Sequence, residues 1–507
     1  MTNQIKTVLF SAMVFFAAAM LGAQAFPALD PSPKAGEYAR RIAQNDSRWR
    51  DLAEAALWAS SVNAGPGAEE KAAAYISRIE TAAADLAAAD LPRDTKERGE
   101  YVLTYLHQYF LKSYSEHQSR IDEIIISGKY NCVSSAVLYM VLGLSVGLDV
   151  SGVMTHDHAF ATVRIGTEYI DVETTTPYGY EPGVRKEFHD AFGKTTGFAY
   201  APAKNYRDRA AISRMELVSL ILSNRIADLE RRNRFTEVIP LAINRAVFLS
   251  ANPVTQGVTA PSATAQNVTN NPKTELFGDP RQDMMDRLFN VSADYIKAGK
   301  EDAAIAWAQY AEERFPDPGW QDVYKTAGNN KLVKLIKAKR TADARTALTA
   351  LQPKLSNEHY RELETMVIDA EAVEKVNAIR NPGDAEAALA FLDQIGEQLP
   401  VSRRNDMRTK IIVDESERLR KTRNVREAIF WLESALQTYG ANPTVEAALK
   451  TQRQNRIGEL HNEFANLFNK RDYTGALASI QKSLQEFPGE RMLLQDLDMA
   501  EKAVRGQ

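Results

Sequence analysis

The 507-residue chain contains a single cysteine, Cys132, which stands directly before an apolar stretch. From Val133 to Leu144 the apolar residues recur at helical spacing, which predicts a helix over residues 131–147 with the cysteine in its first turn. The unpaired N–H groups at a helix N-terminus stabilise a thiolate, the nucleophilic form of cysteine. Placement alone leaves two readings of Cys132, a nucleophile or an inert buried thiol.

A nucleophilic thiol needs a base, and histidine is the usual one. His156 and His158 follow the predicted helix, and His158 opens a segment of alternating residues that predicts a strand. Alternation places Ala159 and Ala161 on one face of that strand and His158 and Phe160 on the other. We expect the cysteine-bearing helix to pack on the face that carries His158. His156 has the same parity but precedes the strand, so it is the reserve candidate.

A third group should orient the imidazole and hold its tautomer. Gly166-Thr167 predicts a two-residue hairpin turn, which places Asp171 and Glu173 on the same face as His158. Glu173 is then one diagonal step from His158, and Asp171 is two steps away. The register favours Glu173, whereas a bulge or a different turn would favour Asp171.

These segments together resemble the transglutaminase-like superfamily of papain-type cysteine domains. The family pattern is a glycine-rich approach to a cysteine that opens a helix, a strand that begins with His-Ala-aromatic, and a strand with an acidic residue followed by x-Thr. The matching segments are Ser127-Gly128-Lys129-Tyr130-Asn131-Cys132, Asp157-His158-Ala159-Phe160 and Ile170-Asp171-Val172-Glu173-Thr174-Thr175. The resemblance covers roughly residues 95–205.

The resemblance implies that Cys132 is the nucleophile, that His158 is the general base and acid, and that an acidic residue orients His158. The chain departs from the family at that third residue. The family usually has aspartate before x-Thr, but Glu173 stands there, with Asp171 two residues earlier, so both stay candidates. The cysteine also follows Asn131 rather than a small or acidic residue.

The implied chemistry is acyl transfer through a thioester on Cys132. The backbone N–H of Cys132 can supply one oxyanion donor, and Gln108 and Tyr130 are candidates for the second. Many bacterial relatives are hydrolases, which favours hydrolysis of an amide. No cofactor is implied, and the sequence has neither a His-x-x-x-His pair nor an acidic calcium loop.

The elements that must position these residues follow from hydrophobic periodicity. Helices are predicted over residues 69–88, 95–114, 120–127 and 131–147, and strands over 150–154, 158–165 and 168–173. Residues 174–203 are rich in Gly, Pro and Tyr and predict an ordered loop. From about residue 210 the sequence is typical of helices.

The C-terminal part carries a weak internal repeat with a small residue in the first turn of a helix. Its recurring segments are Gly299-Lys300-Glu301-Asp302-Ala303-Ala304, Arg340-Thr341-Ala342-Asp343-Ala344, Gly383-Asp384-Ala385-Glu386-Ala387, Asn424-Val425-Arg426-Glu427-Ala428 and Arg471-Asp472-Tyr473-Thr474-Gly475-Ala476. The pattern resembles tetratricopeptide repeats, whose unit is about 34 residues. The spacing here is longer and uneven, so the repeats are degenerate or have longer helices.

The N-terminus has the features of a secretory signal. Lys6 precedes an apolar run from Val8 to Leu21, and Ala23-Gln24-Ala25 fits a small-x-small cleavage site. An uncleaved anchor is the alternative, although the run is short for a membrane span. We expect an exported bacterial protein, periplasmic or secreted, with no membrane span in the mature chain.

Composition and charge exclude some partners and bound the architecture. The net charge is -4, which argues against a nucleic-acid partner. The predicted class is α+β: a papain- or transglutaminase-like core, in which the cysteine-bearing helix packs on a small antiparallel sheet, plus an all-α solenoid like tetratricopeptide repeats. The expected segments are a signal peptide (1–25), an N-terminal helical segment (26–94), the catalytic domain (95–205), a helical connector or first repeat (206–250), a linker or exposed loop (251–281) and helical repeats (282–507).

Three functions remain open at this point. The first is a cysteine peptidase or amidase acting on a protein or peptide, with the repeats binding a protein partner. The second is an inactive fold that serves as a scaffold for protein interactions. The third is a transglutaminase that cross-links proteins.

Overall fold

The structure is a computed structural model that describes residues 26–182, 186–197, 209–250 and 277–506. The predicted signal peptide, residues 1–25, and residues 251–276 of the predicted linker lie outside the described residues. Helices dominate and accompany a small antiparallel sheet, which confirms the α+β class. No helix within the described ranges has both the length and the apolar character that a bilayer span requires. The chain divides into two compact units, Met1–Val323 and Tyr324–Gln507.

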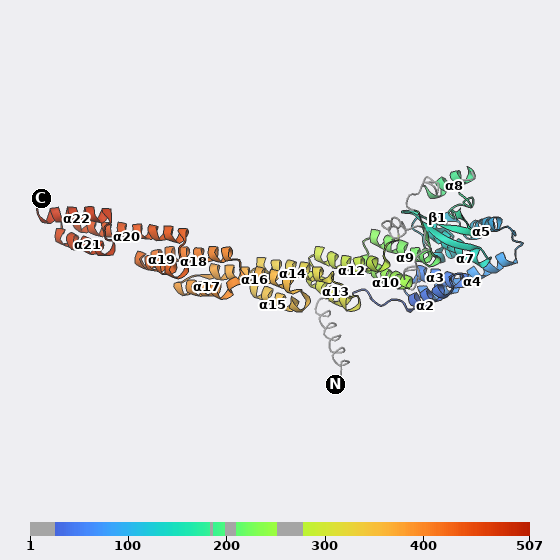
Figure 1. Cartoon of the computed structure of the whole chain (residues 1–507), viewed down its shortest axis with the longest axis horizontal. Coiled ribbons are helices and arrows are strands. Elements are labelled where there is room, and N and C mark those ends of the chain that lie inside the picture. Colours follow the sequence, from blue (N-terminus) through green and yellow to red (C-terminus); the bar gives the residue numbers. More distant parts are fainter. Residues whose placement is uncertain (1–25, 183–185, 198–208, 251–276, 507) are drawn as a thin grey trace, which may run out of the picture. The chain divides into compact units, whose positions relative to one another are not determined.

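The first unit contains the sheet and the helices around it (Figure 1). Its described helices are α2 (Pro33–Gln44), α3 (Trp49–Ser61), α4 (Ala68–Ala88), α5 (Thr95–Tyr109), α6 (Ile121–Ser127), α7 (Cys132–Ser145), α8 (Lys186–Thr196), α9 (Arg214–Arg231), α10 (Phe235–Ser250), α12 (Pro280–Lys297) and α13 (Glu301–Arg314). Its described strands are β1 (Ser113–Tyr114), β2 (Lys129–Tyr130), β3 (Asp149–Met154), β4 (Ala159–Ile165), β5 (Glu168–Val172) and β6 (Ala210–Ile212).

The main sheet has the strand order β5-β4-β3-β6, and all its neighbours are antiparallel. Ile165 pairs with Glu168, so Gly166 and Thr167 form the predicted two-residue turn. Gly166 has φ +61°, a conformation that glycine adopts without strain. Thr162 lies opposite Asp171, which confirms the predicted register of the hairpin.

Helix α7 lies at the centre of the first unit and is buried without interruption from Val133 to Gly143. It packs against α3, α5 and α9 and against strands β3 and β4 (Figure 1). A helix that is apolar on all sides is stable only in such an interior position. This burial fixes the position of its first residue, Cys132.

The sheet face that α7 covers differs from the predicted one. A Cβ on Gly143 of α7 would lie 2.8 Å from Val150 Cγ2, so these two residues are in close contact. Val150 pairs with Val163, and Ala161 shares their face of the sheet. Helix α7 therefore covers the alanine face, not the opposite face to which His158 was assigned. His158 lies one residue before β4 begins, where strand alternation no longer determines its direction.

Two further elements of this unit correct the sequence analysis. The predicted loop over residues 174–203 contains helix α8, which buries Phe188 and Phe192, one turn apart. The predicted helix over residues 95–114 ends at Tyr109, and β1 follows it. The Gly, Pro and Tyr residues around α8 favoured a loop in the sequence analysis, because the apolar face of this helix is short.

The N-terminal helices belong to the same compact unit as the sheet. Helix α3 packs against both α7 and α9. Ser60 Oγ of α3 accepts a hydrogen bond from the backbone N–H of Ile121 (2.8 Å), and Arg225 of α9 donates to the carbonyls of Ala59 (2.7 Å) and Val62 (2.8 Å). These bonds tie residues 26–94 to the predicted catalytic segment through Ile121 and to the predicted connector through Arg225.

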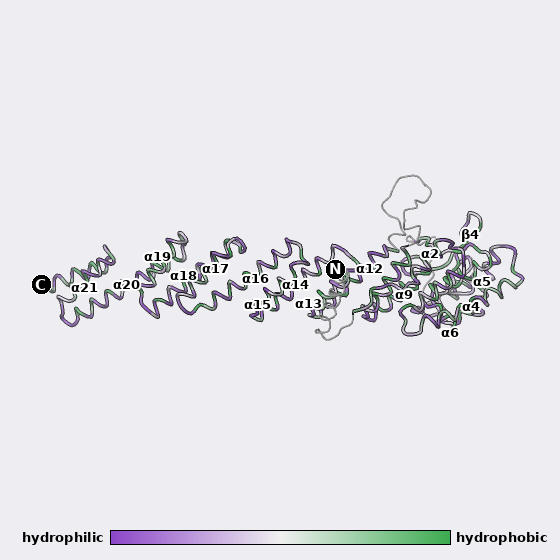
Figure 2. The backbone as a smooth tube through the Cα atoms, turned by 90° about the horizontal axis from the view of Figure 1, so that it is seen from below, coloured by the Kyte–Doolittle hydropathy of each residue, from purple (hydrophilic) through white to green (hydrophobic). Residues whose placement is uncertain are grey.

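The second unit consists of helices that carry both polar and apolar residues (Figure 2). They are α15 (Thr341–Leu351), α16 (Asn357–Ala378), α17 (Pro382–Ile395), α18 (Val401–Thr422), α19 (Val425–Tyr439), α20 (Pro443–Asn469), α21 (Tyr473–Glu486) and α22 (Arg491–Val504), preceded by α14 (Trp320–Lys337), which begins just before the boundary. The recurring segments of the sequence mark the starts of α13, α15, α17, α19 and α21. The small residues in those first turns, Ala304, Ala344, Ala385, Ala428 and Ala476, are all fully buried.

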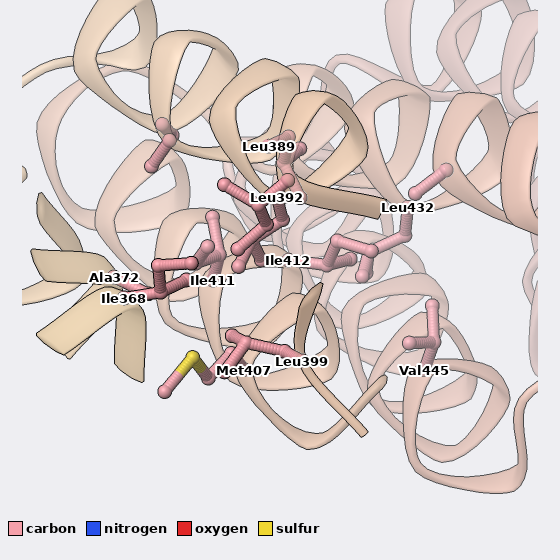
Figure 3. Close-up of a cluster of buried hydrophobic side chains, with 14 residues drawn as sticks. Ile368, Ala372, Leu389, Leu392, Leu399, Met407, Ile411, Ile412, Leu432 and Val445 are labelled. Atoms are coloured by element: carbon pink, nitrogen blue, oxygen red, sulfur yellow. The ribbon is translucent and has the colours of Figure 1, made fainter. Parts of the chain in front are cut away.

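The apolar residues of the second unit form successive clusters rather than one core. One cluster joins α16 to α20 and includes Ile368, Leu392, Ile411 and Leu432 (Figure 3). Another lies between α14, α15 and α16, and a third lies between α20, α21 and α22. Such a series of local clusters is typical of helical repeat arrays.

Candidate active site

Cys132 is the first residue of α7, and the cap before it holds the chain in place. The side chain of Asn131 accepts a hydrogen bond from Ser134 N (3.0 Å), and Ser134 Oγ accepts one from Asn131 N (2.9 Å). This reciprocal pair is a capping box. Asn131 also donates to the carbonyl of Glu116 and to Ser119 Oγ, both at 2.9 Å. The asparagine that departs from the family pattern thus anchors the helix that starts with Cys132.

His158 follows a tight turn that links β3 to β4. The backbone N–H of Thr155 donates to the carbonyl of His158 (2.8 Å). The imidazole lies beside the rings of Phe160 and Phe192, with both centroid distances at 6.1 Å. The side chain of His158 is 16% exposed, so most of the imidazole is buried.

Glu173 lies against the imidazole of His158. Its Oε2 is 2.5 Å from His158 Nε2, and the carboxylate is 3% exposed. Its Oε1 accepts hydrogen bonds from the backbone N–H (3.1 Å) and the hydroxyl (2.8 Å) of Thr175. A carboxylate held in this way can fix the ring orientation and the proton at Nε2.

Cys132 and His158 line the same cleft, and the interaction between them is one of the causes that shift the pKa of His158. Because Nε2 faces Glu173, Nδ1 is the nitrogen left for the thiol. Burial by itself lowers the pKa of His158, but the charges of Glu173 and Cys132, with hydrogen bonds to both, raise it well above 6.5. These charges therefore favour the protonated imidazole in the cleft that it shares with the sulfur. The structure thus brings Cys132, His158 and Glu173 into one continuous chain of contacts.

Asp171, the other candidate for the third position, is engaged elsewhere. Arg209 donates to both of its carboxylate oxygens, from Nη1 to Oδ2 (2.6 Å) and from Nη2 to Oδ1 (2.5 Å). The guanidinium also lies 5.4 Å from the centroid of the Phe160 ring. Asp171 therefore belongs to a bidentate ion pair, and the structure does not bring it to His158. His156, the reserve base, is exposed at the rim of the site.

The segment after Glu173 is held by three side chains from different elements. His107 Nε2 of α5 lies 3.1 Å from the carbonyl of Thr174, Tyr130 of β2 donates to the carbonyl of Thr175 (2.9 Å), and Ser135 of α7 bonds to Thr174 Oγ1 (2.7 Å). Thr174, Thr175 and Thr176 are fully buried. This anchoring positions Glu173, and it was not predicted from the sequence.

His107 is suited to this anchoring because it remains neutral. Burial is the main cause that lowers its pKa to about 4, with a smaller contribution from the nearby charge of Lys112; hydrogen bonds to Thr174 and Thr176 oppose the shift. A neutral ring can donate from Nε2 to the Thr174 carbonyl without a buried charge. Gly179 closes the same turn: its N–H donates to the Thr176 carbonyl (3.2 Å), and a Cβ there would overlap the carbonyl oxygen of Glu173.

The two residues suggested as second oxyanion donors have other partners or positions. The hydroxyl of Tyr130 is bonded to the Thr175 carbonyl, as described above. Gln108 is exposed, and its amide donates to the hydroxyl of Tyr109 (3.2 Å). Neither lines the cleft at Cys132, which corrects both suggestions.

A cleft with a volume of about 550 Å³ opens at Cys132 and His158. Apolar residues of α7, α8 and α9 form part of its wall: Val133, Phe192, Leu220 and Ala227. Polar residues at its border are Tyr114, Glu116, His117, His156, Asp157, Asn224 and Arg231. A cleft of this size accommodates a few residues of an extended peptide.

The described residues contain no group of three or more His, Cys, Asp or Glu side chains placed to hold a metal ion. Comparison with known proteins finds no protein-family model that matches the chain and no curated protein that matches its sequence.

Proposed function

We propose that this chain is an exported cysteine acyl-transfer enzyme of the transglutaminase-like superfamily that hydrolyses an amide bond in a protein or peptide. The observation that carries the proposal is the sequence of contacts from Cys132 through His158 to Glu173. A thiol at the start of a buried helix, an imidazole beside it and a carboxylate behind the imidazole are the parts of a cysteine nucleophile with its base.

The geometry supports the following mechanism. The sulfur of Cys132 attacks the carbonyl carbon, and the carbonyl electrons move to the oxygen, which becomes an oxyanion. As the oxyanion collapses, the C–N bond breaks and His158 gives the proton at Nδ1 to the leaving amine. His158, now neutral, accepts a proton from water as the water oxygen attacks the carbonyl carbon of the thioester. The C–S bond then breaks, which releases the carboxylic acid and returns Cys132 to the thiolate. The charge of Glu173 stabilises the imidazolium both before His158 protonates the leaving amine and after His158 accepts the proton from water.

We further propose that the second unit binds the protein substrate or a protein partner. Its buried first-turn alanines and its successive apolar clusters favour a helical repeat array like tetratricopeptide repeats. Such arrays offer surfaces suited to extended peptides. Export through the N-terminal segment, residues 1–25, would place the enzyme in the periplasm or outside the cell.

The reactivity of the thiol tests the proposal. Because Cys132 is the only cysteine, the rate of alkylation by iodoacetamide reports on this site alone. At pH 6 we expect alkylation at least about 10-fold faster than that of glutathione, whose thiol is protonated. His158→Ala should remove this advantage, whereas His156→Ala, a matched change at an exposed histidine, should keep it. A rate equal to that of glutathione, unchanged by His158→Ala, would refute the proposal.

A second measurement separates hydrolysis from cross-linking. Incubation with a protein mixture and the amine monodansylcadaverine should yield new protein termini and no fluorescent product. Cys132→Ala supplies the background for both readouts. Fluorescent labelling of protein that depends on Cys132 would instead establish transglutaminase activity.

A further inference from the structure

Acyl transfer at Cys132 produces an oxyanion that needs two hydrogen-bond donors. The backbone N–H of Cys132 can be one of them, since the first N–H groups of a helix have no partner within the helix. The structure assigns other roles to Tyr130 and Gln108. The second donor must therefore come from another residue that borders the cleft at the sulfur.

Tyr114 is held beside Cys132 by the pairing of two short strands. Strand β1 runs parallel to β2, and Tyr114 of β1 lies opposite Tyr130 of β2. Tyr130 in turn stands two residues before Cys132 in the sequence. The next backbone N–H, of Ser115, donates to the carbonyl of Tyr130 (2.7 Å). The two tyrosine rings are perpendicular, with centroids 5.9 Å apart. Tyr114 borders the same cleft as Cys132 and His158.

The hydroxyl of Tyr114 is available as a donor. In the part of the chain that the structure describes, no hydrogen bond engages this hydroxyl, in contrast to that of Tyr130. Burial, followed by the charges of Cys132 and Glu173, raises the pKa of Tyr114 well above its usual value of 10. The phenol therefore keeps its proton at neutral pH, in the cleft that it shares with Cys132.

We propose that Tyr114 is a catalytic residue that donates a hydrogen bond from its hydroxyl to the oxyanion formed at Cys132, together with the backbone N–H of Cys132. This inference rests on the acyl-transfer function proposed above and adds a residue to it. The proton stays on the tyrosine throughout. The hydrogen bond strengthens as negative charge develops on the substrate oxygen and weakens when the C–N bond breaks and the carbonyl forms again.

Two reagents that both react with Cys132 test this role. Alkylation by iodoacetamide displaces iodide from a saturated carbon and forms no oxyanion. p-Nitrophenyl acetate transfers its acetyl group to the sulfur through an oxyanion, and p-nitrophenolate leaves with the electrons of the C–O bond. Tyr114→Phe removes only the hydroxyl, so we expect a loss of about 10²–10³-fold in acetylation. The rate of alkylation should stay within about 3-fold, because no oxyanion forms in that reaction.

The control is Tyr109→Phe, the same change at an exposed tyrosine outside the cleft, which should leave both rates unchanged. Unchanged acetylation in Tyr114→Phe would overturn the role of Tyr114. An equal loss of both reactions would also overturn it, since the hydroxyl would then act on the thiol or on the fold. Failure of the proposed function is distinguishable, because wild-type Cys132 would then react with iodoacetamide no faster than glutathione.

Discussion

The carboxylate of Glu173 lies 2.5 Å from Nε2 of His158, although Glu173 stands one residue beyond the end of its strand. Two hydrogen bonds from Thr175 hold the other carboxylate oxygen, so this residue has little freedom to turn away. The pair is nearly excluded from water. In such surroundings an ion pair is much stronger than at a surface, and with Nε2 engaged by Glu173 it leaves Nδ1 as the nitrogen available to the thiol.

The choice between Glu173 and Asp171 can be tested by removing one charge at a time. Glu173→Gln should slow acetylation of Cys132 by p-nitrophenyl acetate by about 10²–10⁴-fold, because the imidazole loses its orienting charge. Asp171→Asn should change that rate by less than about 3-fold but lower the stability by about 1–2 kcal/mol, because the pair with Arg209 is lost. Rates come from the p-nitrophenolate burst and stability from thermal unfolding. If Asp171→Asn caused the larger loss of rate, Asp171 would be the orienting residue.

The protonation of His158 gives a second prediction. Its pKa lies well above 6.5 because Glu173 and Cys132 outweigh burial. Protonation of His158 therefore stabilises the fold fully below pH of about 6.5, and this contribution disappears as the pH rises through the folded-state pKa. In Glu173→Gln the carboxylate charge is absent, so burial should lower the pKa of His158 relative to the wild-type protein. NMR of ¹³C-labelled histidine is practical with seven histidines, and an identical titration in both proteins would contradict the assignment.

His107 should make the first unit sensitive to acid. Its folded-state pKa of about 4 lies below the unfolded value of about 6.5, so the unfolded chain binds a proton first as the pH falls. Stability is therefore lost as the pH falls from about 6.5 to about 4, and the loss amounts to about 2–3 kcal/mol at pH 4.5. His107→Gln can still donate to the Thr174 carbonyl but takes up no proton.

The measurement for His107 is the melting temperature of the first unit at pH 7 and at pH 4.5. The wild-type protein should lose more thermal stability over this interval than His107→Gln. Equal losses in the two proteins would show that His107 is not the group that takes up the proton on unfolding.

The second unit allows a matched test of its buried alanines. Ala344 in the first turn of α15 is fully buried between α14, α15 and α16, whereas Ala342 in the same turn is exposed. Ala344→Leu should cost about 1–3 kcal/mol through overpacking, and Ala342→Leu less than about 0.5 kcal/mol. Hydrogen exchange of α15 and α16 compares the two variants. Similar exchange in both would argue against close helix packing at the recurring segments.

Local sequence determined the parts of the site that depend on short-range chemistry. Gly166 and Thr167 specify a turn of only two residues, and a turn of that length sets which residues of β4 and β5 face each other. The apolar run after Cys132 likewise requires a buried helix, with the cysteine at its start. For these reasons the hairpin register, the position of Cys132 and the nearness of Glu173 to His158 could be predicted, whereas the prediction that α7 packs on the His158 face was wrong.

Only the tertiary structure decided between the carboxylates and arranged the groups behind them. Asp171 is engaged by Arg209, 38 residues later in the sequence, and Glu173 is held by a segment that His107 anchors from 67 residues away. Periodicity describes which side of an element is apolar, but it does not say which distant cation or carbonyl will meet a given side chain. The packing of α7 on the alanine face of the sheet was likewise decided by close contact between Gly143 and Val150, a fit of shapes that no local pattern contains.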